Sequence, residues 1–218
     1  IAGVSGNGQS ELIRCITGLE KVDGGNVIIN NKDITNHTVM NIRESGIAHI
    51  PEDRYMWGSA PDATLAENAL MGYEDNKEFS KKGILNINKV TKHATDLIYK
   101  FRVKADSPSQ KIKELSGGNA QKLIVAREMS KETPLIIACE PTRGIDIGAI
   151  EFIHDQLVEK RNNGDSVLLV SSELSEIMDL SDRIYVIYEG EIVGEFKRGS
   201  IDEKELGLLM VGGKNNEK

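Results

Sequence analysis

A glycine-rich segment near the start of the chain has residue types suited to binding phosphate. We call residues 3–10 the glycine loop; they are Gly3, Val4, Ser5, Gly6, Asn7, Gly8, Gln9 and Ser10. This is the spacing of a phosphate-binding loop, in which backbone N–H groups and the following helix N-terminus surround the phosphates. Glycine allows the tight turn and the close approach of the backbone. A glycine-rich turn without any ligand would have the same composition, so this segment alone leaves both interpretations open.

One position of the glycine loop departs from the phosphate-binding pattern. The pattern has lysine where this chain has Gln9, so the point charge that contacts the terminal phosphates is missing. A charge-assisted hydrogen bond contributes about 1.5–3 kcal/mol, so its loss predicts nucleotide binding weaker by about one to two orders of magnitude. Ser10 keeps a hydroxyl that can contact Mg²⁺.

A second candidate anion site lies at residues 115–122, which we call the signature segment. It places Ser116, Gly117 and Gly118 directly before a predicted helix, where the helix dipole favours an anion. A serine N-cap after a glycine turn is the alternative interpretation. The sequence Leu-Ser-Gly-Gly-Asn-Ala-Gln-Lys closely resembles the signature of ABC-type ATPases, with Asn119 where Gln is common.

The resemblance to ABC-type ATPases continues at residues 134–146, which look like the Walker B strand followed by the D-loop. In the family this strand ends in Asp-Glu: the Asp orients Mg²⁺ through water and the Glu acts as base toward the attacking water. Here Cys139 replaces the Asp, and Glu140 keeps the second position. Because a neutral thiol is a poor partner for a cation that prefers oxygen, Cys139 is predicted to pack in the core.

Two further family positions differ in this chain. Residues 170–174 occupy the place of the switch segment, with Ser172 where the family histidine contacts the terminal phosphate. Residues 50–54 fall at the Q-loop, with Glu52 in place of the glutamine that links Mg²⁺ to the helical subdomain. The resemblance thus implies Glu140 and Ser172 as catalytic residues and Ser10 and Glu52 as metal contacts. The nucleotide contacts that it implies are Gly3, Ser5, Gly6, Asn7, Gly8, Gln9, Ser10, Glu11, Ser116, Gly117 and Gly118.

The elements that must position these residues follow from hydrophobic periodicity and turn signals. Helices are predicted at residues 11–19, 64–72, 90–101, 119–130, 149–162 and 174–180. Strands are predicted at residues 26–29, 47–50, 135–139, 166–170, 184–188 and 191–196, the first as one arm of a hairpin. The alternation of strand and helix after residue 134 predicts a parallel sheet covered by helices. Residues 212–218 have the composition of a frayed tail.

Together with the resemblance, this pattern predicts an α/β P-loop NTPase fold of the ABC-type ATPase domain. We expect a RecA-like nucleotide-binding core with a parallel sheet from residues 1–56 and 126–218. We expect an inserted helical subdomain at residues 57–125 that ends in the signature motif. Because residues 1–4 resemble the end of a buried strand, the N-terminal strands of the fold are expected to be missing, and the chain to be a fragment of a longer polypeptide.

Composition limits the classes of function. The 218 residues include 39% hydrophobic and 28% charged residues, without a run of about 18–20 apolar residues, which predicts a soluble globular protein. The net charge of −7 argues against a general nucleic-acid surface. The two cysteines show no paired spacing, which favours a reducing compartment, and the four histidines show no ligand spacing.

The resemblance also carries an expectation about function. ABC ATPases work as head-to-tail pairs in which each nucleotide lies between one unit's P-loop and the other unit's signature. Four altered catalytic positions beside a nearly intact signature therefore predict a unit that donates its signature while its own site is degenerate. The motifs are similar to the second, C-terminal ATPase domain of duplicated import ATPases for nucleosides or simple sugars. In the full protein we expect an ATP hydrolase, and from this domain alone weak activity or none.

The same resemblance implies cofactors, partners and a location. The cofactors are ATP and Mg²⁺. The partners are the N-terminal ATPase half of the same polypeptide, an integral membrane permease and, indirectly, an extracytoplasmic solute-binding protein, with no nucleic acid. The expected location is peripheral, on the cytoplasmic face of the plasma membrane.

Several alternatives stay open from the sequence. The domain could be an independently active ABC ATPase with Glu140 as base and Gln9 tolerated, or a soluble non-transport ABC-like protein, which would be expected to carry basic patches or long inserted arms. Met56 and Trp57 are expected either in the core or in a groove for the permease. Lysines of the helical insertion are expected on a solvated helix face, with an anion site as the alternative; they are Lys81, Lys82, Lys89, Lys92 and Lys100.

Overall fold

The computed structural model describes residues 1–74 and 76–213. The chain divides into two compact units, each of which is described by itself. The first unit consists of Ile1–His49, Thr133–Glu140 and Asp165–Lys218, and the second of Ile50–Glu132 and Pro141–Gly164. The domain boundaries expected from the sequence stay a prediction.

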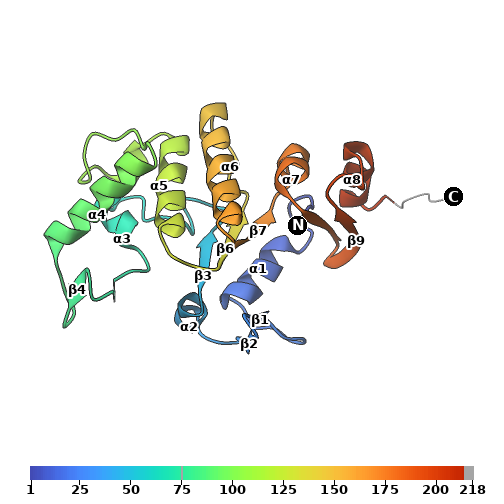
Figure 1. Cartoon of the computed structure of the whole chain (residues 1–218), viewed down its shortest axis with the longest axis horizontal. Coiled ribbons are helices and arrows are strands. Elements are labelled where there is room, and N and C mark those ends of the chain that lie inside the picture. The colour runs from blue at the N-terminus through green and yellow to red at the C-terminus, as the bar shows by residue number, and fades with distance from the viewer. Residues whose placement is uncertain (75, 214–218) are drawn as a thin grey trace. The chain divides into compact units, whose positions relative to one another are not determined.

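A three-stranded sheet forms the centre of the first unit (Figure 1). Its strand order is β3 (Ile47–Ile50), β6 (Leu135–Cys139), β7 (Ser166–Val170). β6 and β7 are parallel and in register from Leu135↔Ser166 to Cys139↔Val170. The mainly apolar sequences of these strands, each with two β-branched residues, suit a sheet that is covered by other elements. The predicted parallel sheet is confirmed.

The core of the first unit packs against this sheet. It consists of Ile13, Ile34, Ile42, Ile47, Ile137, Cys139 and Val170. Helix α1 (Gln9–Thr17) contributes Ile13, and helix α2 (Val39–Glu44) contributes Ile42. Cys139 is 5% exposed within this cluster, and its Sγ lies 3.8 Å from Nε2 of His49. The expectation that Cys139 packs in the core is therefore confirmed.

Two hairpins and two further helices complete the first unit. The hairpins are β1 (Ile28–Ile29) with β2 (Lys32–Asp33), and β8 (Arg183–Tyr188) with β9 (Glu191–Lys197). Ala2 forms parallel bridges to Ser171 and Val186, so the start of the chain pairs with the end of β7 on one side and with β8 on the other. The helices are α7 (Leu174–Leu180) and α8 (Glu203–Met210), and Asp202 caps α8.

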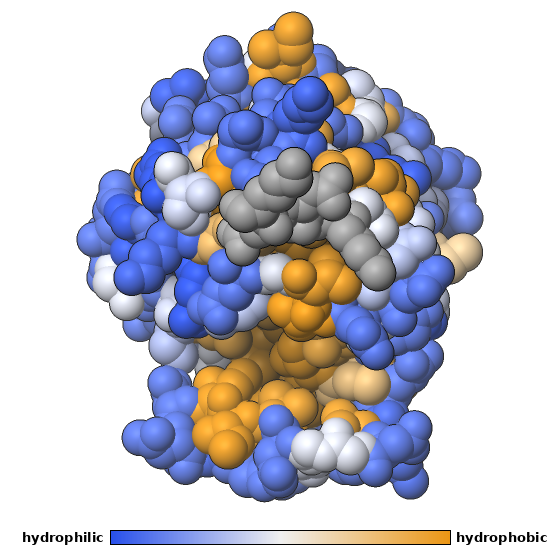
Figure 2. Space-filling model, turned by 90° about the vertical axis from the view of Figure 1, so that its right-hand side faces the viewer, coloured by the Kyte–Doolittle hydropathy of each residue, from blue (hydrophilic) through white to orange (hydrophobic). Residues whose placement is uncertain are grey.

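Apolar side chains remain exposed on the first unit. Figure 2 shows apolar side chains gathered around a hollow on the face that it displays. Exposed apolar residues of this unit include Ile28, Ile192, Val193, Leu208 and Val211.

The second unit is built mainly from helices. They are α3 (Leu65–Leu70), α4 (Ile87–Lys100), the short 3-10 helix η1 (Ile112–Glu114), α5 (Gly117–Met129) and α6 (Ile147–Asn162). α3 begins with a capping box formed by Thr64 and Glu67, and α4 begins at Ile87 rather than 90 because the side chain of Asn86 caps it. α5 lies against α3, α4 and α6. A small hairpin, β4 (Ser80–Lys81) with β5 (Ile84–Leu85), was not predicted.

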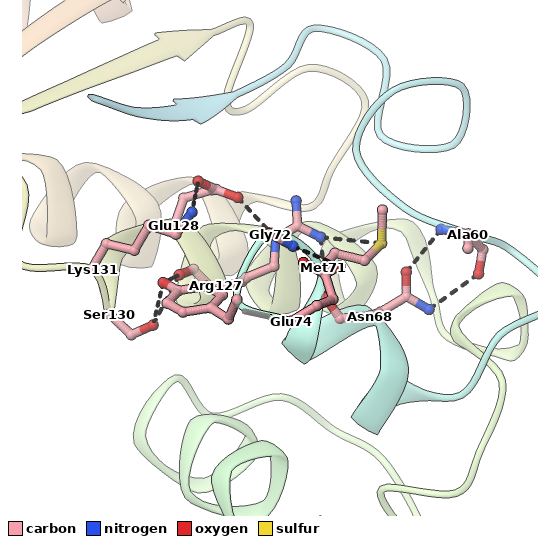
Figure 3. A network of polar contacts seen from close by, with 10 residues as sticks. Ala60, Asn68, Met71, Gly72, Glu74, Arg127, Glu128, Ser130 and Lys131 are labelled. Carbon is pink, nitrogen blue, oxygen red and sulfur yellow. Dashed lines mark hydrogen bonds and ion pairs between the residues drawn. The ribbon is translucent and has the colours of Figure 1, made fainter. Parts of the chain in front are cut away.

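A buried polar network joins α3 to α5 (Figure 3). Arg127 pairs with Glu128 at 2.9 Å and donates to the backbone oxygen of Asn68 at 3.2 Å. The side-chain amide of Asn68 bonds both the N–H and the C=O of Ala60. Tyr73 donates its hydroxyl to the backbone oxygen of Arg127 at 2.6 Å. Because buried charges are costly unless paired, this network favours one relative placement of the two helices.

None of the helices within the described ranges combines the length and the apolar composition needed to cross a lipid bilayer. Of the predicted frayed tail at 212–218, residues 214–218 lie outside the described residues.

The first prediction concerns His93, which packs between the rings of Tyr73 and Phe79. Burial lowers the pKa of His93 from its ordinary value of 6.5, although Glu78 and Asp96 act in the opposite direction. The unfolded chain therefore binds more protons near and below that pH, so the free energy of unfolding should fall as pH drops below about 6.5. His93→Gln should reduce this pH dependence in thermal unfolding followed by circular dichroism. Equal slopes for His93→Gln and wild type would contradict the assignment.

Candidate functional site

The glycine loop connects Ala2 to helix α1. Gly6 and Gly8 have φ values of 93° and 103°, which lie in the left-handed region that favours glycine. Gly8 immediately precedes α1, and a Cβ added to it would lie 3.0 Å from the Cα of Gly190. Asn7 fixes the loop to the β8–β9 turn by accepting from the N–H groups of Glu189 and Gly190. The fold thus brings the predicted loop residues together at one helix N-terminus.

The side chain of Gln9 fills the inside of this loop. Its Oε1 accepts from the backbone N–H of Asn7 at 3.0 Å, and its Nε2 donates to the backbone oxygen of Val4 at 3.0 Å. Gln9 is only 8% exposed, and a Cβ added to Gly3 would lie 2.3 Å from its Nε2. A phosphate in the loop would therefore compete with this amide for the N–H of Asn7. The sequence indicated the missing charge but not this internal hydrogen bonding.

The predicted metal contacts fit Mg²⁺ poorly. Mg²⁺ prefers oxygen ligands, but the strand end where the family has a carboxylate presents the sulfur of Cys139, which lies in the core against His49. Ser10 lies in the first turn of α1, and Glu52 is exposed in the second unit. Among the residues that the structure describes, no group of three or more His, Cys, Asp or Glu side chains is arranged to hold a metal ion.

Glu140 and Ser172, whose catalytic roles stay a prediction, lie next to each other. They follow the adjacent parallel strands β6 and β7, whose carboxyl ends meet at one edge of the sheet. The Ser172 N–H donates to Glu140 Oε1 at 2.8 Å, and the Ser172 hydroxyl donates to Oε2 at 3.1 Å. Glu140 has φ 44°, an uncommon conformation for a residue with a side chain. Both carboxylate oxygens are thus hydrogen-bonded on the protein side.

Glu11, the remaining predicted nucleotide contact in the first unit, lies on the exposed side of α1. It forms an ion pair with Arg14 at 3.2 Å, in which the Glu11 side chain is 61% exposed. Neighbouring charges on a helix surface often pair in this way without a further role.

The signature segment begins helix α5. Ser116 caps the helix, with its Oγ accepting from the backbone N–H of Asn119 at 3.4 Å, and the side chain is exposed. Gly117 and Gly118 are the first residues of the helix, where backbone N–H groups lack partners within the helix. The capping role that the sequence left as an alternative is therefore present. At the positive end of this helix the Ser116 side chain is exposed, whereas Gly117 is half-buried and Gly118 is buried.

Packing explains the two glycines of the signature segment. A Cβ on Gly118 would lie 2.6 Å from Oδ2 of Asp146, and a Cβ on Gly117 would lie 3.3 Å from a guanidinium nitrogen of Arg54. Asp146 is itself fixed, since its carboxylate caps helix α6 by accepting from the N–H of Ala149 at 3.0 Å. Larger residues would push the helix end away from these side chains.

Arg54 joins the signature segment to the turn that follows β6, a role that the sequence did not indicate. Its guanidinium donates to the backbone oxygens of Gly117 at 3.1 Å, Arg143 at 2.5 Å and Gly144 at 3.4 Å. Gln121 adds a buried hydrogen bond to the backbone oxygen of Pro141 at 2.9 Å. The five donors of a guanidinium suit several carbonyl acceptors at once, so Arg54 holds the two segments in one arrangement.

An exposed apolar patch follows Arg54. Tyr55, Met56 and Trp57 are 41%, 70% and 56% exposed. Core packing of Met56 and Trp57, one of the two alternatives from the sequence, is therefore wrong. The lysines of the helical insertion are all exposed, in agreement with a solvated face; they are Lys81, Lys82, Lys89, Lys92 and Lys100.

Comparison with known proteins assigns this arrangement of motifs to a family. A family model described as ABC transporter matches residues 1–143. The chain belongs to the ABC transporter family. Over 217 residues it is 48% identical to the guanosine import ATP-binding protein NupO of Bacillus subtilis (strain 168) and 45% identical to the nucleoside import ATP-binding protein NupA of Lactococcus lactis subsp. cremoris (strain MG1363). The match covers 100% of this chain but only 42% and 43% of these relatives, so the chain spans less than half their length.

Solved ABC cassettes confirm the predicted fold. The dimeric ATP-binding cassette MJ0796, in a post-hydrolysis state bound to ADP and Pi, is similar with a TM-score of 0.76 and 25% identity, covering 92% of this chain and 84% of that one. The cassette MJ1267 is similar with a TM-score of 0.75 and 26% identity, covering 96% and 82%. The ABC protein described here therefore has the P-loop NTPase fold of an ABC ATPase, with a parallel sheet and helical parts.

The role of Arg54 leads to the second prediction. Arg54→Lys keeps the positive charge but cannot reach three carbonyl oxygens in a fixed geometry. We expect the free energy of unfolding to fall by about 1–3 kcal/mol in denaturant titrations, because charge-assisted hydrogen bonds are lost. Arg183→Lys, at a side chain that is 63% exposed, should change it by less than about 0.5 kcal/mol. Equal effects of the two substitutions would show that Arg54 does not join these segments.

Proposed function

We propose that this chain is an ATP-binding part of an ABC importer for nucleosides or simple sugars and forms the C-terminal ATPase half of a duplicated protein. Its signature segment completes an ATP site whose glycine loop belongs to the N-terminal half, while its own site is degenerate. The observation that carries the proposal is the contrast between the two anion sites. Gln9 fills the glycine loop from within, whereas Ser116 lies exposed at the start of α5.

The chemistry of the signature segment supports its proposed role in completing the ATP site of the other half. A hydroxyl and backbone N–H groups at the positive end of a helix can stabilise charge on a transferring phosphoryl group without having to reorganise. Arg54 and Asp146 hold this helix end in place. ATP and Mg²⁺ would be bound by the glycine loop of the other half, since this chain's own strand end offers Cys139 instead of a carboxylate. Ser10 and Glu52 stay proposed contacts of Mg²⁺. The proposed contacts of a weakly held nucleotide in the loop stay Gly3, Ser5, Gly6, Asn7, Gly8, Gln9, Ser10 and Glu11.

The relatives support an import function and its solute class. The two described above are named for nucleoside and guanosine import. A relative from Haloferax volcanii (strain ATCC 29605), 42% identical over 215 residues, is named for glucose import. The higher identities favour nucleosides. The share of 42–43% of the relatives' length is what one of two similar halves would occupy, which supports the duplicated arrangement.

The partners follow from the same proposal. In an importer the ATPase contacts an integral membrane permease, at the cytoplasmic face of the plasma membrane, and through it a solute-binding protein outside. The exposed patch of Tyr55, Met56 and Trp57 is a candidate for the permease contact, because exposed aromatic side chains and methionine are enriched at protein interfaces. In this proposal, residues 57–125 form the helical subdomain that passes the closure of the ATPase around nucleotide on to the permease. Residues 1–56 and 126–218 form the nucleotide-binding core.

One observation favours a second candidate, an ATPase that is active on its own. Glu140 and Ser172 lie together at the carboxyl end of the parallel strands, where a base and a phosphate contact would be needed. Against this candidate, both Glu140 oxygens already accept hydrogen bonds, and the glycine loop contains no lysine.

The third prediction tests the main proposal in the full-length protein with its permease. Ser116→Arg places a bulky cation at the phosphate-facing end of α5 and should reduce steady-state ATP hydrolysis by about 100-fold or more. Gln9→Ala, in the degenerate loop, should change it by less than about threefold. The opposite ranking would reject the proposal.

The fourth prediction separates the second candidate from the first. Glu140→Gln keeps the shape of the side chain but removes the base. In the full-length protein we expect ATP turnover to change by less than about threefold, because the proposed competent site uses the base of the other half. Loss of turnover by about 100-fold or more would favour an active site in this half.

A further inference from the structure

Asn119 holds the hydroxyl of Ser116 through its side-chain amide. Its Nδ2 lies 2.9 Å from Oγ of Ser116, and its Oδ1 lies 2.8 Å from the backbone N of Lys104. The backbone N–H of Asn119 also points to the same Oγ, at 3.4 Å. The two residues are one helical turn apart, where side chains are neighbours.

The contact with Lys104 fixes which way the amide faces. A backbone N–H can only donate, so the atom of Asn119 next to Lys104 must be the oxygen. The NH₂ group then faces Ser116 and donates to its oxygen. The loop that carries Lys104 is itself braced, because the N–H of Asp106 donates to Oε1 of Gln110 at 3.0 Å.

This arrangement determines the role of the Ser116 hydroxyl. A hydroxyl oxygen has two lone pairs and one hydrogen, and here the oxygen accepts from the side chain and the backbone of Asn119. The hydroxyl hydrogen is thereby left to donate in another direction. Within residues 1–74 and 76–213, no hydrogen bond donated by this hydroxyl is found, and Ser116 is exposed.

We propose that Asn119 is a positioning residue that directs the hydroxyl hydrogen of Ser116 toward the terminal phosphate of a nucleotide bound by the partner half. Phosphate oxygens carry no hydrogen when fully ionised, so they bind donors and repel lone pairs. A serine whose lone pairs are already occupied presents its hydrogen without reorganisation, which is the condition for effective stabilisation of a transferring phosphoryl group. The inference rests on the proposed function, because it assumes that the signature segment faces a nucleotide.

Asn119→Asp tests the direction of the hydroxyl with a nearly isosteric change. One carboxylate oxygen can still accept from Lys104, but the other now accepts the hydrogen of Ser116 and turns it away from the phosphate. In the full-length protein with its permease, we expect kcat for ATP hydrolysis to fall by about 10- to 100-fold, with a smaller change in KM. The thermal unfolding midpoint should stay close to that of the wild type.

Gln110→Glu is the matched control. Gln110 lines the same surface depression as Ser116 and Asn119, and a glutamate there adds the same charge while keeping the acceptor for Asp106. It has no bond to Ser116, so kcat should stay within about twofold of the wild type. A loss equal to that of Asn119→Asp would assign the effect to negative charge alone and overturn the inference.

Two more variants separate a positioning role from a structural one. Asn119→Ala frees the hydroxyl without adding charge and should lower kcat by about 3- to 10-fold; if Asn119→Asp does not fold, this variant carries the test. In the Ser116→Ala background, adding Asn119→Asp should lower kcat by little more than adding Gln110→Glu does. The reason is that the Ser116 hydroxyl, through which Asn119 acts, is absent. Additive losses would overturn the inference.

The result for Ser116→Ala by itself separates this inference from the proposed function. If Ser116→Ala lowers turnover but neither change at Asn119 does, the signature segment acts as proposed and Asn119 does not direct it. If Ser116→Ala leaves turnover unchanged, the proposed function fails, and the inference fails with it.

Discussion

The side-chain amide of Gln9 occupies the backbone N–H of Asn7, a donor that a phosphate in the glycine loop would otherwise engage. It accepts from the N–H of Asn7 and donates to the oxygen of Val4, so the loop is closed by hydrogen bonds within the chain. A lysine in the same place would bring a positive charge toward a phosphate, and a glutamine brings none. In the proposed function, these internal hydrogen bonds and the missing charge make the glycine loop a weak nucleotide site. If this half binds nucleotide poorly, the preserved part of its machinery must serve another site.

The start of α5, which the proposal assigns to the nucleotide site of another half, is held in position by several contacts. Arg54 and Gln121 attach it to residues 141–144, and Asp146 lies so close to Gly118 that no larger residue would fit without movement. Asp146 also caps α6, so the two helices share one fixed turn. Backbone N–H groups act on an anion only if they are held in place, because any reorganisation would cost part of the stabilisation. These contacts supply that rigidity.

The carboxyl ends of β6 and β7 lead into Glu140 and Ser172, the two residues with predicted catalytic roles. Glu140 and Ser172 lie side by side, and the hydroxyl of Ser172 bonds the carboxylate. Cys139, the neighbour of Glu140, has become part of the core. The parallel strands thus place a buried thiol where the family has a carboxylate, and sulfur is a poorer ligand for Mg²⁺ than oxygen.

The sequence by itself determined the strands of the central sheet, the helices that follow the two glycine motifs, and the residue types of both candidate sites. These features are local: periodic apolar residues set the element type, and glycines before a helix set the turn. It could not determine that Gln9 folds into its own loop, since the lack of lysine does not fix a rotamer. Nor could it indicate the bonds from Arg54 to Gly117 and Arg143, or the place of Lys104 beside Asn119, because these partners are distant along the chain. Only the tertiary structure decides which donors and acceptors meet, since that depends on how the separate segments pack.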